Sequence, residues 1–174
     1  MMASSRPVQA DDGATEGVPE RRAARVVLVD RTPAVLLLGG RDPSDPTALP
    51  FWFVPGGGAE DGEPTEDAAR RELYEETGTT LGDLGPVVWA RQADFFFDRR
   101  AFHQAEVFYV VRTESFTVRA TALTEDEDRF INSWRWWPLA DLATTDEVVY
   151  PVDLARLVAQ WLTDGPAPGP ARIR

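Results

Sequence analysis

Three glutamates within one short stretch have the types and the spacing to do chemistry. Glu72, Glu75 and Glu76 stand at positions i, i+3 and i+4, which in an α-helix places their carboxylates on one face about 100° wide. Like charges at this spacing repel one another and destabilise a helix. A hard divalent cation such as Mg²⁺ or Mn²⁺ would offset that repulsion, because such ions prefer carboxylate oxygens. A solvated helix face is the alternative that these residues alone leave open.

The residues around the glutamates predict the helix that would position them. Thr65 is a good N-cap, and Glu66 and Asp67 place negative charge in the first turn, where the helix dipole favours it. The expected helix runs over residues 66–77. It ends at Gly78, because glycine commonly caps a helix at its C-terminus.

A glycine run precedes this helix. A short aromatic strand is expected over residues 51–54, followed by a proline and three consecutive glycines. Glycine has no Cβ, so Gly56, Gly57 and Gly58 permit positive φ angles and a close approach of the backbone to a ligand. We therefore expect a sharp turn here, with a loose surface turn as the alternative.

Glycine and charged residues stand at fixed intervals across the whole stretch. In chain order they are Gly57, Glu63, Arg71, Glu72, Leu73, Glu75, Glu76 and Gly78. This pattern resembles the signature of the Nudix hydrolase family, the MutT-like pyrophosphohydrolases. It departs from that signature at its last position, which is usually aliphatic and is Thr79 here.

The resemblance implies a hydrolase acting on phosphorus-containing acid anhydrides. In such an enzyme water attacks the diphosphate of a small nucleoside-diphosphate-type substrate, such as a nucleotide, a nucleotide sugar or a dinucleotide, with Mg²⁺ or Mn²⁺ as cofactor. The cation ligands that it implies are Glu72, Glu75 and Glu76, completed by a backbone carbonyl of Gly56 or Gly57.

The resemblance also implies roles for the other charged residues. Arg71 would hold a glutamate in place through a charge-assisted contact, and Glu63 would support the loop and helix or bind a further metal. Catalytic roles fall on Arg71, Glu75 and Glu76. One more carboxylate, from the acidic stretch over residues 120–128, would bind a metal or act as the base; we expect Glu127 first and Glu125 second.

Two other functions remain open. A binding module of the same fold would sense a nucleotide without cleaving it, although the intact glutamates speak against a retired site. Processing of RNA ends is disfavoured by the net charge of −11, because nucleic-acid binding relies on basic patches that displace counterions. A small-molecule partner is therefore expected rather than a nucleic acid.

Composition limits the class of protein. The 174 residues include no cysteine, which excludes disulfides and thiolate sites. No apolar run reaches the roughly 20 residues of a membrane span, and residues 1–20 resemble no signal peptide, so we expect a soluble cytoplasmic protein. The expected organisation is a flexible tail over residues 1–20, one domain over residues 21–163 and a flexible tail over residues 164–174.

Alternating and helical patterns predict the scaffold. Strands are expected over residues 21–30 and 34–38 as one hairpin, over residues 86–97 and 101–113 as a second, and over residues 133–137, with an amphipathic helix over residues 151–162. This is an α/β (α+β) fold, a mixed β-sheet sandwiched between helices, as in the Nudix fold.

Single residues of the second hairpin carry narrower expectations. Phe95, Phe96 and Phe97 are expected in the core or at a dimer interface rather than as base-stacking platforms, and a homodimer fits the interface. His103 is expected on the surface of the hairpin. Glu106 is expected at an outward-facing edge position, with an inward-facing position near the site as the alternative.

Overall fold

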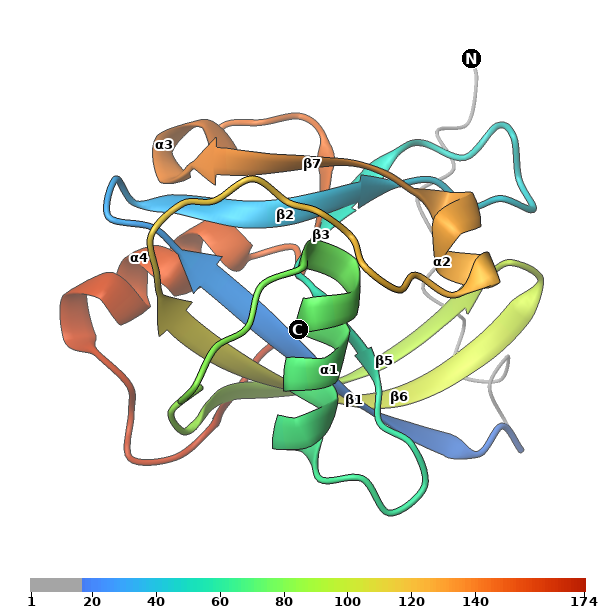
Figure 1. Cartoon of the computed structure of the whole chain (residues 1–174), viewed down its shortest axis with the longest axis horizontal. Helices are drawn as coiled ribbons and strands as arrows, with labels where there is room; N and C mark the ends of the chain where they lie inside the picture. The colour runs from blue at the N-terminus through green and yellow to red at the C-terminus, as the bar shows by residue number, and fades with distance from the viewer. Residues whose placement is uncertain (1–16) are drawn as a thin grey trace.

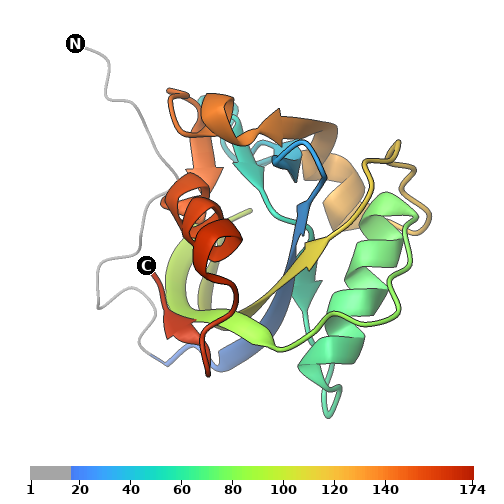
Figure 2. The ribbon, with the colours of Figure 1, turned by 90° about the vertical axis from the view of Figure 1, so that its left-hand side faces the viewer.

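A curled mixed β-sheet with helices on both faces forms the molecule (Figures 1 and 2). The computed structural model describes residues 17–174, so most of the tail predicted over residues 1–20 lies outside the described residues. The predicted α+β class, a mixed sheet sandwiched between helices, is confirmed. The domain boundaries at residues 21 and 163 stay predictions.

The described chain forms nine strands and four helices. The strands are β1 (Glu20–Val29), β2 (Ala34–Gly40), β3 (Phe51–Phe53), β4 (Gly56–Gly58), β5 (Val87–Phe97), β6 (Arg100–Arg112), β7 (Ile131–Pro138), β8 (Val148–Tyr150) and β9 (Ala171–Arg172). The helices are α1 (Thr65–Thr77), α2 (Glu125–Phe130), α3 (Leu139–Leu142) and α4 (Leu154–Asp164). The sheet order is β8-β3-β2-β1-β6-β5-β9, and β4 and β7 pair with β1 and β2.

Strand β1 lies at the centre and organises the sheet. It pairs in parallel with β6 along its whole length, and antiparallel with both β2 and β4. The pairing of β1 with β2 and of β5 with β6 confirms the two predicted hairpins. Because successive residues of a strand face opposite sides, Val26 and Leu28 pack on one face and Val27 and Val29 on the other.

Each face of the sheet has its own hydrophobic core. On one face α1 packs through Ala68, Ala69 and Leu73, which are fully buried against β1. On the other face α4 packs through Leu154 and Val158, also fully buried, as its 3.6-residue pattern predicts. The two helices therefore enclose the sheet between them (Figure 2).

Several local predictions differ from the structure. Thr65 is the first residue of α1 and not its N-cap, because Pro64 holds that position and the Thr65 hydroxyl lies 3.2 Å from the Tyr109 hydroxyl. Gly78 caps the helix in the left-handed conformation, as predicted, with φ of 73°. Within residues 17–174, no helix is both long and apolar enough to cross a bilayer.

Two segments predicted to lack regular structure contain a helix or a strand. Part of the acidic stretch over residues 120–128 forms the start of α2 instead of a plain loop. In the segment predicted as a C-terminal tail, β9 pairs in parallel with β5, and the Ile173 N–H donates to the Ala90 carbonyl at 3.0 Å.

Candidate active site

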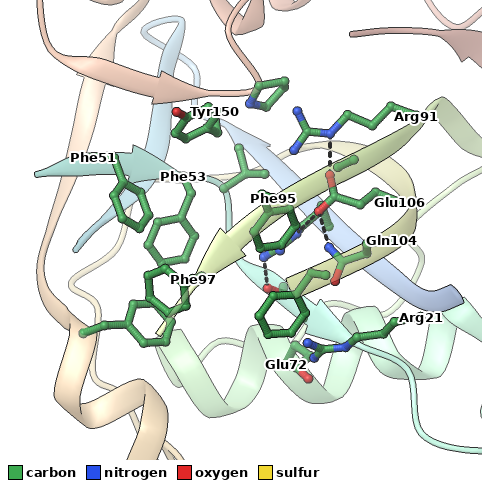
Figure 3. A pocket seen from close by; sticks show the side chains of 18 of the residues that line it. Arg21, Phe51, Phe53, Glu72, Arg91, Phe95, Phe97, Gln104, Glu106 and Tyr150 are labelled. Carbon is green, nitrogen blue, oxygen red and sulfur yellow. Dashed lines mark hydrogen bonds and ion pairs between the residues drawn. The ribbon is translucent and has the colours of Figure 1, made fainter. Parts of the chain in front are cut away.

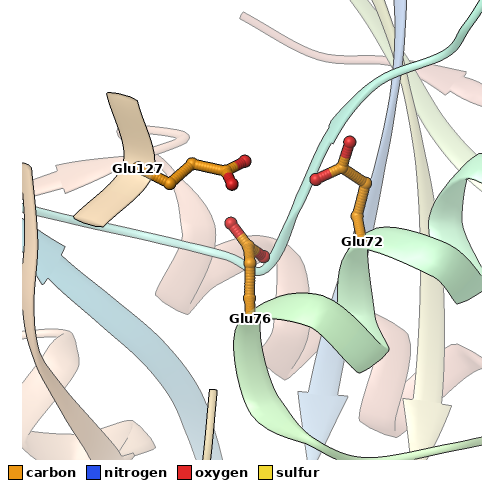
Figure 4. Close-up of side chains that lie close together, drawn as sticks. All are labelled: Glu72, Glu76 and Glu127. Atoms are coloured by element: carbon orange, nitrogen blue, oxygen red, sulfur yellow. The ribbon is translucent and has the colours of Figure 1, made fainter. Parts of the chain in front are cut away.

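Three glutamate carboxylates converge between α1 and α2 (Figure 4). Glu72 and Glu76 lie one helical turn apart on α1, and Glu127 projects toward them from α2. One oxygen from each carboxylate lies within 4.8 Å of the others. We call these residues the glutamate cluster. The first two side chains are buried, whereas Glu127 is partly exposed.

The cluster holds more negative charge than nearby protein groups neutralise. Burial raises the pKa of Glu76 well above its ordinary value, although the Gly56 N–H donates to its Oε2 at 2.7 Å. Burial also raises the pKa of Glu72, and Glu72 Oε2 has no hydrogen-bond partner in the described structure. Burying an unpaired carboxylate oxygen is unfavourable. A hard divalent cation fits this donor set, because it would satisfy the orphaned oxygen and the repelling charges together.

The glycine run lets the backbone lie directly against Glu72. A Cβ on Gly57 would stand 2.5 Å from Glu72 Oε2, so any other residue there would displace the Glu72 carboxylate. Gly56 has φ of 125°, a region that favours glycine, and a Cβ there would collide with the Ala24 carbonyl. The predicted turn thus forms the short strand β4 against β1.

Arg71 forms hydrogen bonds with two glutamates outside the cluster and with one of its members. Its guanidinium donates to both carboxylate oxygens of Glu63, at 2.9 and 3.0 Å, to Glu75 at 3.3 Å, and to Glu72 Oε1 at 2.8 Å. Glu63 also accepts from the Glu60 N–H at 2.8 Å. The Arg71 hydrogen bond lowers the pKa of Glu63 to about 2. The structure therefore brings neither Glu63 nor Glu75 into the glutamate cluster.

Glu127 is held in place by the start of its own helix. The backbone N–H and the hydroxyl of Thr124 both donate to Glu127 Oε2 at 2.8 Å, and the Glu127 N–H donates back to the hydroxyl at 3.2 Å. This is a capping box. Its sequence signal, a threonine three residues before a glutamate, identifies Glu127 and not Glu125, which the structure leaves outside the cluster.

Glu106 is buried in the cleft, so the prediction that it faces outward was wrong. It is 2% exposed on β6. Its Oε1 accepts from Arg25 Nε at 3.0 Å and from Gln104 Nε2 at 2.7 Å, and its Oε2 accepts from Arg91 Nε. Burial alone would raise the pKa of Glu106, but the two arginines lower it. We call these four residues the Glu106 network.

The network also touches the glycine run. Arg25 donates through Nη1 to the Gly56 carbonyl. The N–H of the same glycine donates to Glu76 Oε2. Gly56 therefore links the Glu106 network to the glutamate cluster. The pairing of β1 between β4 and β6 brings these residues together, and it is a long-range feature that the local pattern around Glu106 does not contain.

A cleft of about 710 Å³ lies over both groups (Figure 3). Its volume lies in the usual range of small-molecule sites. Arg21 stands at its edge, with its guanidinium 5.7 Å from the Phe102 ring centroid. It is close enough to Glu72 and Glu127 to feel both charges, yet among residues 17–174 it forms no ion pair or side-chain hydrogen bond. His103 pairs with Asp94 at 2.7 Å and is partly exposed on the second hairpin.

Comparison with curated proteins finds relatives over part of the chain. An RNA pyrophosphohydrolase of Dinoroseobacter shibae is 45% identical over 64 residues, 37% of this chain and 38% of the relative. An RNA pyrophosphohydrolase of Sphingopyxis alaskensis is 36% identical over 81 residues, 47% of this chain and 48% of the relative. The chain thus matches less than half the length of these relatives.

Solved structures share the fold. A MutT NUDIX hydrolase from Burkholderia pseudomallei gives a TM-score of 0.58 at 22% identity, covering 82% of this chain and 98% of that one. The NUDIX domain of Shewanella oneidensis NrtR, complexed with ADP ribose, gives a TM-score of 0.59 at 18% identity, covering 88% and 94%.

A family model closes the comparison. The model of the NUDIX domain matches residues 19–156, which include the glycine run, α1 and the whole glutamate cluster. This match spans most of the chain. The chain therefore belongs to the NUDIX domain family.

Proposed function

We propose that this protein is a divalent-cation-dependent hydrolase that cleaves the diphosphate linkage of a small nucleoside-diphosphate-type substrate. The observation that carries the proposal is the glutamate cluster, in which two buried carboxylates with raised pKa values and one orphaned oxygen face a third carboxylate. Family membership and the pyrophosphohydrolase names of the curated relatives support it.

Glu72, Glu76 and Glu127 are the side chains that we assign to the cation. Mg²⁺ is the expected ion, with Mn²⁺ as an alternative, because both prefer oxygen ligands. The Gly56 carbonyl already accepts from Arg25, which favours Gly57 as the backbone ligand. When bound, the cation neutralises the charge of the diphosphate.

Glu63, Glu75 and Arg71 take supporting roles in this proposal. Arg71 holds Glu72 by one hydrogen bond while Glu63 anchors the other edge of its guanidinium. A bidentate arginine–carboxylate pair fixes orientation as well as charge. Of the two roles predicted for Glu63, the geometry favours support of the loop and helix over binding of a further metal.

Glu127 is also the carboxylate that we assign to the attacking water. It is the partly exposed member of the cluster, so solvent reaches it. In the reaction a water oxygen bonds to phosphorus, the bridging P–O bond breaks, and the water proton passes to a carboxylate and then to solvent. The leaving group departs as a phosphate. Arg21, whose guanidinium is unpaired within the described part of the chain, is the cation available to that phosphate.

The test is hydrolysis of a panel of nucleoside triphosphates, dinucleotides, nucleotide sugars and ADP-ribose with Mg²⁺ or Mn²⁺. We expect monophosphate or phosphate release by the wild type and loss of turnover in Glu127→Gln. Glutamine keeps the capping box, so this variant removes charge alone. Glu125→Gln is the matched control, an exposed glutamate of the same helix outside the cluster.

Three outcomes would contradict the assignments. Unchanged turnover in Glu127→Gln would show that Glu127 takes no part in the reaction. Equal losses in Glu125→Gln and Glu127→Gln would show a general charge effect of α2. Thermal stabilisation by a nucleotide without hydrolysis of any substrate would favour a nucleotide-sensing module of the same fold.

The names of the curated relatives favour a second candidate, the diphosphate at an RNA end. The net charge of −11 opposes it, because an RNA chain is a polyanion. A short 5′-triphosphorylated RNA in the same panel separates the two: the mononucleotide is expected to have the higher kcat/KM. A higher kcat/KM for the RNA would reverse the assignment.

A further inference from the structure

Seven aromatic rings line the cleft without belonging to either hydrophobic core. Phe95 and Phe102 stack on each other, with ring centroids 5.1 Å apart at 13°. The other five contact one another, and we call them the aromatic cluster: Phe51, Phe53, Phe97, Phe130 and Tyr150. All five are partly buried, whereas core rings such as Trp89 and Phe108 are buried. None of Phe95, Phe96 and Phe97 belongs to either core, so of the two positions predicted for this triplet the core is wrong and a dimer interface stays a prediction.

Strand alternation aims these rings into the cleft. On β3, Phe51 and Phe53 face the cleft while Trp52 between them packs on the core against Trp137, with ring centroids 5.3 Å apart. On β5, Phe97 faces the cleft and the preceding Phe96 is 42% exposed outside it. Figure 3 shows Phe51, Phe53 and Phe97 on one side of the cleft, and Arg91, Gln104 and Glu106 of the Glu106 network on the other.

The rings of the aromatic cluster contact one another at edge-to-face or tilted angles. Phe97 contacts Phe130 with centroids 5.0 Å apart at 79°, and Phe51 contacts Phe97 at 6.1 Å and 84°. Tyr150 contacts Phe51 at 6.0 Å and 71°. None of the contacts among Phe51, Phe53, Phe97 and Phe130 is a parallel stack: two are edge to face, and Phe53 is tilted by 46° against Phe51 and by 40° against Phe130. An aromatic face is suited to stack on another planar ring.

Charged groups near the cluster pair with each other. Arg129 lies 3.6 Å from both Asp98 and Asp126, and Arg100 lies 3.7 Å from Asp126. Across the cleft, both arginines of the Glu106 network bind its carboxylate. A ligand seated on the rings therefore meets stacking surface first, and the charged groups named here are already paired with one another.

From this arrangement we infer that the aromatic cluster binds the nucleobase of the substrate and selects it by ring area rather than by its hydrogen-bonding edge. Stacking accepts any base, because every base has a π-face. Purines, with the larger ring system, bind more tightly than pyrimidines. The substrate class is thus purine nucleoside diphosphate derivatives, without strong choice between adenine and guanine. This inference rests on the proposed function only for the statement that the substrate carries a diphosphate.

The test is binding of AMP, GMP, CMP and ribose 5-phosphate to the metal-free chain in EDTA, by calorimetry or by NMR titration. All four probes carry the same phosphate, so their differences report the base. We expect AMP and GMP within about threefold of each other, CMP weaker, and ribose 5-phosphate weaker than AMP by about tenfold, as stacking on one ring predicts.

Matched variants locate the effect. Phe97→Leu is expected to weaken AMP binding at least about fivefold and to leave ribose 5-phosphate unchanged. Phe96→Leu, the neighbouring residue outside the cleft, is expected to change neither. Since Phe97 also touches Phe130 on α2, Phe51→Leu on β3 is the second variant, and thermal unfolding checks the fold of each.

Several results would overturn the inference. Equal affinities for AMP and ribose 5-phosphate, including failure of both to bind, would show that the rings hold no base. More than tenfold preference for one purine over the other would show reading of the base edge. A chain that binds AMP through Phe97 but hydrolyses nothing would refute the proposed function and retain this inference. Equal hydrolysis of purine and pyrimidine substrates would do the opposite.

Discussion

Glu76 and Glu106 are both buried carboxylates under the same cleft, and their surroundings are opposite. They are 3% and 2% exposed. Glu106 accepts from two arginines and a glutamine, which lower its pKa despite burial. Burial raises the pKa of Glu76, and the two neighbouring carboxylates act in the same direction, although the Gly56 N–H donates to it.

The difference separates a structural carboxylate from one that needs a ligand. A buried charge is stable when protein groups of the opposite sign compensate it, and this is the condition of Glu106. Compensation of the glutamate cluster is weaker within the described residues: Arg71 forms an ion pair with Glu72 alone among its members, and Arg21 and Arg25 act on the cluster without an ion pair. The compensation is therefore expected from a bound cation.

The largest effect is expected from Glu76→Gln. Turnover with Mg²⁺ falls by about 10³-fold, because a positioned carboxylate of the site is lost. The free energy of unfolding in EDTA is unchanged or rises, because the variant removes an uncompensated buried charge. Steady-state kinetics and urea unfolding measure the two. Glu66→Gln, at a partly exposed glutamate of the same helix that lies outside the cluster, is the control.

Glu106→Gln tests the other half of the comparison. It leaves two arginines facing a neutral amide, so the free energy of unfolding is expected to fall by about 3 kcal/mol. Urea unfolding measures the loss. Glu114→Gln removes an exposed partner of Arg31 and is expected to change stability by under about 1 kcal/mol. Equal effects of the two variants would contradict the structural role of the Glu106 network.

Thr124→Val asks whether the capping box supplies Glu127 to the cluster. The variant keeps the shape of the side chain and removes the hydroxyl that donates to Glu127 Oε2. The dissociation constant for Mn²⁺ is expected to rise about fivefold, since an N-cap is worth about 1 kcal/mol. Electron spin resonance of free Mn²⁺ measures it. Thr124→Ser should bind Mn²⁺ as the wild type does. If it does not, the hydroxyl of the capping box does not position Glu127 for cation binding.

The smallest effect is the pH dependence of Glu63. Its pKa lies near 2 in the folded chain against an ordinary value of 4.5, because Arg71 donates to it. The stability from this pair is therefore present above about pH 4.5 and is lost as the pH falls toward 2. Glu63→Gln should lower stability by about 1 kcal/mol at pH 7 and match the wild type near pH 2. A difference that persists at pH 2 would contradict the ion pair as its source.

Local features of the site could be predicted from the sequence. The one-turn spacing of Glu72 and Glu76 places both on one face of α1, and the glycines before the helix allow the backbone to approach Glu72. Both depend on neighbours in the chain. The same holds for the C-cap at Gly78, whose φ of 73° is the conformation that glycine favours.

Features set by contacts between residues distant in sequence could not be predicted from the sequence. Glu106 reads as an edge residue until β1 and β5 place Arg25 and Arg91 on either side of it. Phe97 reads as core until the pairing of strands places its face of β5 over the cleft. Glu75 matches the family pattern as well as its neighbours do, yet its carboxylate lies against Arg71 outside the cluster.

Calorimetric titration of the metal-free chain with Mn²⁺ tests the central claim most directly. The uncompensated glutamates should bind the ion saturably in the wild type and in Glu66→Gln, with affinity at least about tenfold lower in Glu72→Gln and Glu76→Gln. Unchanged affinity in these two variants, or no binding to the wild type at millimolar Mn²⁺, would contradict the account that a cation completes the glutamate cluster.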